Sequence, residues 1–246
     1  MINIPATENL PAAFESYRTE DPYILSEEER LNLLRKFHIY EQLIEEFPVS
    51  IGKEASRKER DTRVDILQSE STLTYGEVEF ISMGEVFETI KARYGGIPEG
   101  GCFYDLGSGT GKGVLTAALL HSFNQCKGIE ILQGLYQISS QIKEKYDLEF
   151  LHFVQENPDL WTKAPEITFY CGDFFENNLS DASFIFANST CFSMDMMRRI
   201  GSFPFKPGTI GVTFTKSLPA ESWEILESIK KNMSWGEATV YIHRKK

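Results

Sequence analysis

The sequence has few cysteines and no long apolar run. Its four cysteines are scattered, with no C-x-x-C pair and no histidine at metal-ligand spacing. We interpret them as reduced thiols that pack like small hydrophobes, and we expect no metal site. No apolar stretch reaches the ~18 residues of a spanning helix, and Met1 to Leu25 lacks the pattern of a signal peptide. These absences predict an intracellular protein, nuclear or cytoplasmic, that does not bind membranes.

The chain also lacks an excess of positive charge. It has 25 lysines and arginines against 36 aspartates and glutamates, a formal net charge of -11. Nucleic-acid binding needs clustered cations at the phosphates, so we expect weak or no direct DNA binding and a basic protein partner. Hydrophobic residues at 41% and aromatic residues at 13% are typical of a globular core.

Two regions are expected along the chain, an N-terminal arm with a helical extension over residues 1–72 and a larger domain over 73–246. Three prolines in the first 22 residues favour an extended arm. Ser26 and Glu29 match a capping box, and the apolar residues that follow predict an amphipathic helix up to Pro48. The charged stretch from Lys53 to Arg63 indicates a solvated helix or linker, or alternatively a small basic contact patch.

Strand and helix patterns alternate from about Met83, beginning with a helix that ends near Gly95. Such alternation predicts an α/β fold with a doubly wound, mostly parallel sheet. The predicted strands are Cys102 to Leu106, Gln125 to Glu130, Ile167 to Cys171, Ser183 to Ala187, Thr209 to Phe214 and Ala238 to His243, with helices at Gly111 to His121 and Leu132 to Tyr146.

The first of these strands runs into a glycine-rich turn, and the two together span residues 103–113. Glycines let the backbone approach a ligand, and the next helix offers free N–H groups. A dinucleotide fingerprint would need glycine where Lys112 stands, and a P-loop would need a hydroxyl residue in place of Gly113. Neither of these phosphate-binding motifs therefore matches.

The spacing Asp105-x-Gly107-x-Gly109-x-Gly111 instead resembles the first motif of class I methyltransferases, which use S-adenosylmethionine. Asp105 would recognise the cofactor's ammonium group, directly or through water. Glu130 ends the next strand, where its carboxylate would bind both ribose hydroxyls; the alternative is a helix-capping carboxylate near Leu132.

The turn after the third strand contains Asp173 and Phe174. Asp173 would accept a hydrogen bond from the adenine amine, and Phe174 would pack on the adenine ring. The alternative is an ordinary turn with a core phenylalanine.

These motifs, with residues 184–188, Thr74 to Val78, Ser234-Trp235 and residues 240–243, resemble the disruptor-of-telomeric-silencing family of non-SET histone-lysine methyltransferases. The resemblance covers Leu73 to His243 and implies a seven-stranded class I methyltransferase sheet. It implies catalytic roles for Tyr75, Asn188 and Phe192, of which Asn188 and Phe192 border the lysine channel. The cofactor-binding residues that we expect are Glu77, Val78, Asp105, Gly107, Ser108, Gly109, Gly111, Lys112, Glu130, Asp173, Phe174 and Asn188.

The chain departs from this family at several positions. The family commonly has two adjacent asparagines where Asn188 is followed by Ser189, and threonine where Val78 stands. The resemblance implies that a residue of the terminal strand faces the channel, and the sequence leaves both Val240 and Tyr241 open for this position. Nucleosome-acting members of the family have lysine-rich segments that bind DNA. This chain has only two short basic stretches, residues 57–63 and 243–246.

We therefore expect an S-adenosylmethionine-dependent N-methyltransferase that modifies a lysine of a free basic protein, a histone or another. A desolvating channel would lower the pKa of that lysine, so no general base is named. The alternatives are a methyltransferase for a small-molecule or nucleobase amine, and a catalytically silent cofactor-binding module.

Overall fold

A computed structural model describes residues 24–61, 75–233 and 235–246. The expected N-terminal arm and the expected boundary at residues 72 and 73 lie outside the described residues. Within the described part of the chain, no helix is long and apolar enough to cross a membrane.

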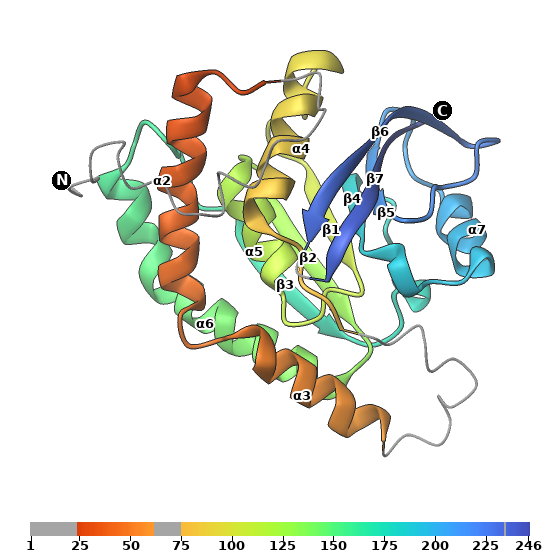
Figure 1. Cartoon of the computed structure of the whole chain (residues 1–246), viewed down its shortest axis with the longest axis horizontal. Helices are drawn as coiled ribbons and strands as arrows, with labels where there is room; N and C mark the ends of the chain where they lie inside the picture. The colour runs from red at the N-terminus through yellow and green to blue at the C-terminus, as the bar shows by residue number, and fades with distance from the viewer. Residues whose placement is uncertain (1–23, 62–74, 234) are drawn as a thin grey trace.

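A seven-stranded sheet forms the centre of the molecule, in the order β3-β2-β1-β4-β5-β7-β6 (Figure 1). The strands from β1 to β5 pair in parallel, and β7 pairs antiparallel to both of its neighbours. The strand order reverses direction between β1 and β4, where doubly wound sheets form a crevice for ligands. The predicted fold class is confirmed. The strands are β1 Cys102–Leu106, β2 Gln125–Glu130, β3 Glu166–Cys171, β4 Ala182–Ala187, β5 Ile210–Phe214, β6 Trp223–Met233 and β7 Gly236–Lys245.

Alternate strand residues enter two separate cores, because successive side chains of a strand point to opposite faces. Phe103 belongs to the first core and Tyr104 to the second. The first core lies under the helices α2 Glu27–Ile44, α4 Phe80–Arg93, α5 Lys112–Leu120 and α6 Gln133–Glu156. The second lies under α7 Met194–Ser202 and the 3-10 turns Phe174–Glu176 (η3) and Ser189–Cys191 (η4).

The two N-terminal helices pack against this domain. The predicted capping box of α2 is present, since Ser26 Oγ accepts from the Glu29 amide and the Glu29 carboxylate accepts from the Ser26 amide. The predicted solvated helix or linker corresponds to helix α3, Val49–Arg60, whose Gly52 and Ser56 are buried. Figure 1 shows α3 beside the start of α6, below the ends of the strands.

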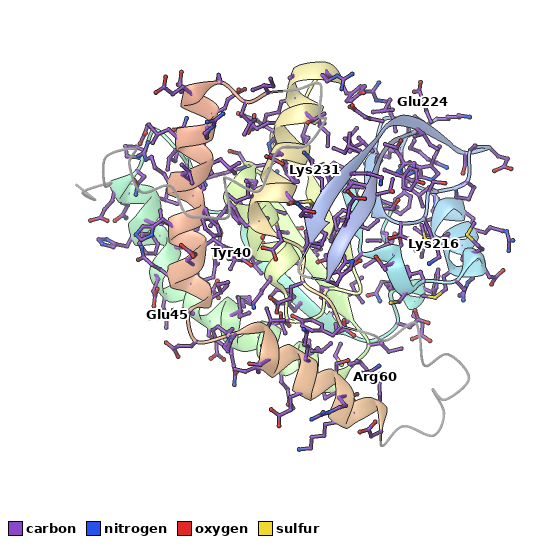
Figure 2. The ribbon with its side chains drawn as sticks, in the orientation of Figure 1. Tyr40, Glu45, Arg60, Lys216, Glu224 and Lys231 are labelled. Atoms are coloured by element: carbon purple, nitrogen blue, oxygen red, sulfur yellow. The ribbon has the colours of Figure 1, made fainter. Side chains whose placement is uncertain are left out.

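The β6–β7 hairpin was predicted only in part, because the sequence analysis identified β7 but not β6. Polar residues dominate β6, and its pairing with β7 contains a bulge between Ile225 and Glu227 that breaks the alternation. Lys231 on β6 is 1% exposed, and its ammonium lies 2.9 Å from the Glu85 carboxylate of α4 (Figure 2). This buried ion pair attaches the hairpin to α4.

Candidate active site

The glycine turn lies at the carboxyl end of β1, beside the point where the strand order reverses. Gly107, Gly109 and Gly111 have φ of 82°, 56° and 84°, a region that other residues rarely adopt. The amides of Gly107 and Ser108 both donate to the Ile129 carbonyl, at 2.9 and 3.0 Å. The turn is thereby fixed to the end of β2.

Glu130, the last residue of β2, is 6% exposed and lies under the turn. One carboxylate oxygen accepts from the Gly109 amide and the other from the Leu132 amide, each at 2.8 Å. Burial raises the pKa of Glu130, and backbone donors, those of Leu132, Gly109 and Ile131, limit the rise. A carboxylate has about four acceptor sites, so Glu130 can accept from a further donor in the cavity.

Asp105 is 3% exposed, and its Oδ1 has no hydrogen-bond partner among the described residues. Burial, with a smaller contribution from the charge of Glu130, raises its pKa well above the ordinary value. Ser108 Oγ is a second buried polar atom without a partner. Buried polar groups are nearly always hydrogen-bonded, so these two atoms indicate a missing polar ligand.

The segment from Tyr75 to Val78 is held to the glycine turn by a buried ion pair. Lys112 Nζ lies 2.8 Å from both Glu77 oxygens, and the two side chains are 5% and 9% exposed. Tyr75 donates its hydroxyl proton to Glu77, and the hydroxyl lies 2.7 Å from Thr110 Oγ1. Lys112 was predicted to bind the cofactor; in the structure its ammonium is paired with Glu77, so it holds this segment in place.

Asn188 follows β4 and joins two distant parts of the chain. Its Nδ2 donates to the Gly76 carbonyl at 3.2 Å, and its Oδ1 accepts from Thr190 Oγ1 at 3.0 Å. Thr190 Oγ1 also lies 3.1 Å from Thr215 Oγ1. Thr215 has φ of 66°, which is strained for a β-branched residue. The orientation of Asn188 therefore depends on contacts from both sides.

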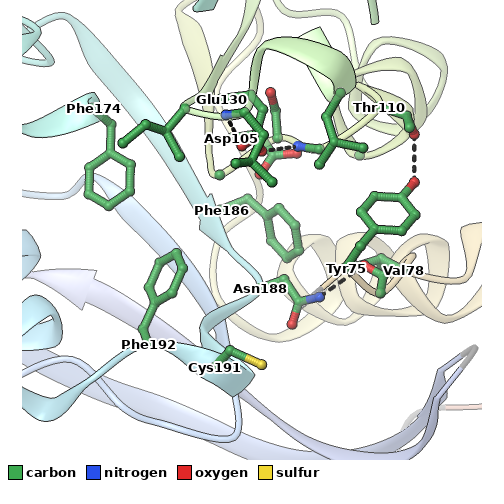
Figure 3. A pocket seen from close by; sticks show the side chains of 18 of the residues that line it. Tyr75, Val78, Asp105, Thr110, Glu130, Phe174, Phe186, Asn188, Cys191 and Phe192 are labelled. Atoms are coloured by element: carbon green, nitrogen blue, oxygen red, sulfur yellow. Dashed lines mark hydrogen bonds between the residues drawn. The ribbon is translucent and has the colours of Figure 1, made fainter. Parts of the chain in front are cut away.

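An aromatic group forms another part of the site. The Phe174 ring lies 5.9 Å from that of Phe192, in a stacked arrangement, so Phe192 turns towards Phe174 (Figure 3). Asp173 Oδ1 accepts from the Phe175 amide at 2.9 Å. The Arg199 guanidinium carbon lies 3.6 Å from the centre of the Phe175 ring, which places α7 against this group.

A cavity of about 610 Å³ connects these groups (Figure 3). Gly111, predicted to bind the cofactor, is absent from its lining; it begins α5 and packs against Phe169. Sequence reasoning missed Phe186, Met196 and Arg199, although Ser193, which caps α7, is a signal that predicts this helix. The predicted site residues that line the cavity are Tyr75, Glu77, Val78, Asp105, Gly107, Ser108, Gly109, Lys112, Glu130, Asp173, Phe174, Asn188 and Phe192.

The unresolved choice between Val240 and Tyr241 can be addressed from the strand register. Val240 pairs with Phe214 and is fully buried in the first core, to which Phe186 also belongs. Tyr241 pairs with Thr213 and is only half-buried. Val240 therefore packs on the same face of the sheet as Phe186, a residue that lines the cavity.

The sequence pattern of one known family, described as "Histone methylation protein DOT1", matches residues 60–235. This region contains the glycine turn, Glu130 and Asn188. The chain belongs to the DOT1 family. It is therefore an S-adenosylmethionine-dependent methyltransferase, and the family resemblance and cofactor expected from the sequence are confirmed. No curated protein sequence matches the chain.

Solved structures of similar fold include an RNA methyltransferase from Salinibacter ruber in complex with S-adenosyl-L-homocysteine. It is 23% identical, with a TM-score of 0.42 over 68% of this chain and 87% of its own. The rRNA methyltransferase AviRa from Streptomyces viridochromogenes is 13% identical, with a TM-score of 0.49 over 69% and 86% of the two chains. At TM-scores below 0.5, neither likeness bears on the function of this chain.

The cavity of this DOT1-family chain fits S-adenosylmethionine. The unpartnered Asp105 oxygen suits the ammonium group of the cofactor, and the Glu130 carboxylate, an acceptor at the cavity wall, suits the ribose hydroxyls. Small-molecule sites occupy ~300 to 1,000 Å³, and the cavity volume lies within this range.

Proposed function

We propose that this DOT1-family protein transfers a methyl group to the side-chain amine of a lysine in a basic protein. The observation that carries the proposal is the position of Asn188, which lies across the cavity from Glu130 and beside Tyr75 and Phe186 (Figure 3). An amide and apolar rings in this position suit an uncharged amine. The family match to histone methylation proteins supports the same substrate class.

We assign the cofactor to the side of the cavity that contains the glycine turn. Asp105 would hold the ammonium group and Glu130 the ribose, while Asp173 and Phe174 would contact the adenine. Asp173 Oδ1 already caps η3, so its other oxygen is the acceptor available to the adenine amine. When bound, the cofactor would supply an electrophilic methyl group on a sulfonium sulfur, and the carbon–sulfur bond would break as the nitrogen–carbon bond to the acceptor forms.

The residues on the opposite side would position the acceptor and exclude water. Tyr75 is fixed by Glu77 and Thr110, and Asn188 is fixed by Gly76 and Thr190, so neither needs to reorganise on binding. Burial of a lysine among Tyr75, Phe186 and Phe192 lowers its pKa, because a desolvated ammonium is disfavoured. The ammonium therefore loses its proton to solvent water as the lysine enters the cavity, and the neutral amine is the form that these residues would position.

The charge of the protein favours a basic partner. A net charge of -11 attracts a lysine-rich chain and repels the phosphates of DNA. We therefore propose a free basic protein, a histone or another, as the substrate in preference to an intact nucleosome.

Incubation of the purified protein with radiolabelled S-adenosylmethionine tests this proposal. Core histones, intact nucleosomes and the protein, RNA and small-molecule fractions of a lysate serve as acceptors. We expect label on a protein lysine, with free histones labelled faster than nucleosomes. Label confined to RNA or small molecules would contradict the proposal, as would cofactor binding without transfer to any acceptor.

A further inference from the structure

Helix α3 contacts the side of the cavity that contains Tyr75. Gly52 faces the Tyr75 ring so closely that a Cβ at this position would lie 2.4 Å from a ring carbon. On its other side the same ring lies against the glycine turn, since a Cβ at Gly109 would be 2.8 Å from it. Tyr75 is therefore clamped between α3 and the turn.

The C-terminal end of α3 contacts the start of α6, which follows Glu130 on the other side of the cavity. The Glu59 carboxylate accepts from the first two amides of α6, those of Gln133 at 3.0 Å and Gly134 at 2.8 Å. The first N–H groups of a helix have no partner within the helix, and a carboxylate there also interacts favourably with the helix dipole. Leu132 occupies the N-cap position of α6, and its apolar side chain cannot accept a hydrogen bond from the helix. Glu59 thus caps α6 from a separate helix.

The start of α6 leads directly to the carboxylate that we assign to the ribose. Only Ile131 and Leu132 separate Glu130 from Gln133, and the Leu132 amide is one of the two backbone donors to Glu130. Ile131 and Leu132 themselves line the cavity. A shift of the first turn of α6 would therefore move both the Glu130 carboxylate and this wall.

We propose that Glu59 is a positioning residue for cofactor binding, which holds Glu130 and residues 131–132 in place by capping α6. Helix α3 then braces the cavity at two points, Tyr75 and the start of α6. Glu59 lies immediately before the region matched by the DOT1 family, residues 60–235. The inference rests on the cofactor site and is independent of which acceptor is methylated.

Calorimetric titration of the full chain with S-adenosylmethionine and S-adenosylhomocysteine tests this role. The Glu59→Gln variant keeps one acceptor oxygen but turns an NH2 group towards the second amide. We expect its Kd for either ligand to rise about fivefold, the effect of losing a good N-cap. Glu54→Gln is the matched control, because Glu54 is exposed on the same helix; its Kd should equal that of the wild type.

Steady-state kinetics separate positioning from a general loss of structure. Glu59→Gln should raise KM for S-adenosylmethionine while kcat at saturating cofactor stays unchanged. Glu59→Asp retains the carboxylate and should weaken binding less than Glu59→Gln. If the glutamine variant does not fold, Glu59→Asp is compared with the wild type, and its shorter side chain should still raise the Kd measurably; an unchanged Kd would then overturn the inference.

Wild-type affinity in Glu59→Gln would overturn the inference and leave the proposed function intact. Equal weakening by Glu54→Gln would also overturn it, because any loss of charge on α3 would then suffice. Absence of binding by the wild-type protein would instead refute the cofactor site itself, and this inference with it.

Discussion

The two sides of the cavity are built differently. The cofactor wall, consisting of Asp105, residues 107–110, Lys112 and Glu130, is formed at the adjacent ends of β1 and β2 and is fixed mainly by backbone amides. The acceptor wall, consisting of residues 75–78 and 188–192, is joined by side chains across 112 sequence positions, from Gly76 to Asn188. Cofactor recognition is thus encoded locally, whereas the acceptor wall requires the complete tertiary structure.

The ion pair between Lys112 and Glu77 connects the two walls, so its loss should have the largest effect. Removing one partner of a buried pair leaves an uncompensated charge, which costs about 3 to 5 kcal/mol. We expect Lys112→Met to lower the free energy of unfolding by roughly this amount in denaturant titrations. The double variant Lys112→Met/Glu77→Gln should recover part of the loss, since no buried charge remains. No recovery would mean that packing, and not the unpaired charge, causes the destabilisation.

Removal of the Glu130 carboxylate tests the cofactor wall alone. Glu130→Ala would lose two hydrogen bonds to the ribose and the acceptors of the Gly109 and Leu132 amides. We expect about 100-fold weaker binding of S-adenosylhomocysteine, measured by calorimetry. A change of less than about threefold would show that Glu130 only caps the following helix, the alternative raised by its position before Leu132.

The corresponding change in the acceptor wall should affect turnover more than binding. We expect Asn188→Ala to reduce kcat about 30-fold through misplacement of the acceptor, with the Kd of the cofactor changed by less than about threefold. Kinetics with a methyl-accepting protein and calorimetry on the same sample separate the two effects. A large loss of cofactor affinity would place Asn188 in the cofactor wall.

The smallest effect is expected at the edge of the acceptor wall. The left-handed conformation of Thr215 costs about 1 to 2 kcal/mol relative to the ordinary backbone regions. Thr215→Gly relieves this strain but increases the entropy of the unfolded chain, so we expect a net stabilisation of up to about 1 kcal/mol. Thermal unfolding measures it, with Thr215→Val as the control that removes the hydroxyl contact and keeps the β-branched side chain. A destabilised glycine variant would show that the Thr215 hydroxyl contributes more than the strain costs.

The sequence predicted the parts of the protein that depend on local pattern. Asp105 and Glu130 could be placed because Asp105 is the penultimate residue of β1 and Glu130 the last residue of β2, and parallel strands end at the same edge of a sheet. The role of Lys112 could not be predicted, since its partner Glu77 lies 35 residues earlier in the sequence, before α4. Strand β6 and the direction of Phe192 also escaped prediction, because the first is polar and the second is set by tertiary contact with Phe174.

The two faces of the sheet also differ in how they are covered. Among the described helices, four lie over the first core, whereas α7 lies over the second with turns and a row of rings that includes Phe175, Phe203, Phe205 and Trp223. Turns and isolated rings leave more backbone open to solvent than helices do. Amide protons beneath α7 should therefore exchange with deuterium sooner than those beneath α4 and α5. We therefore expect local opening to begin on the second face, which includes the side of the cavity that contains Phe174 and Phe192.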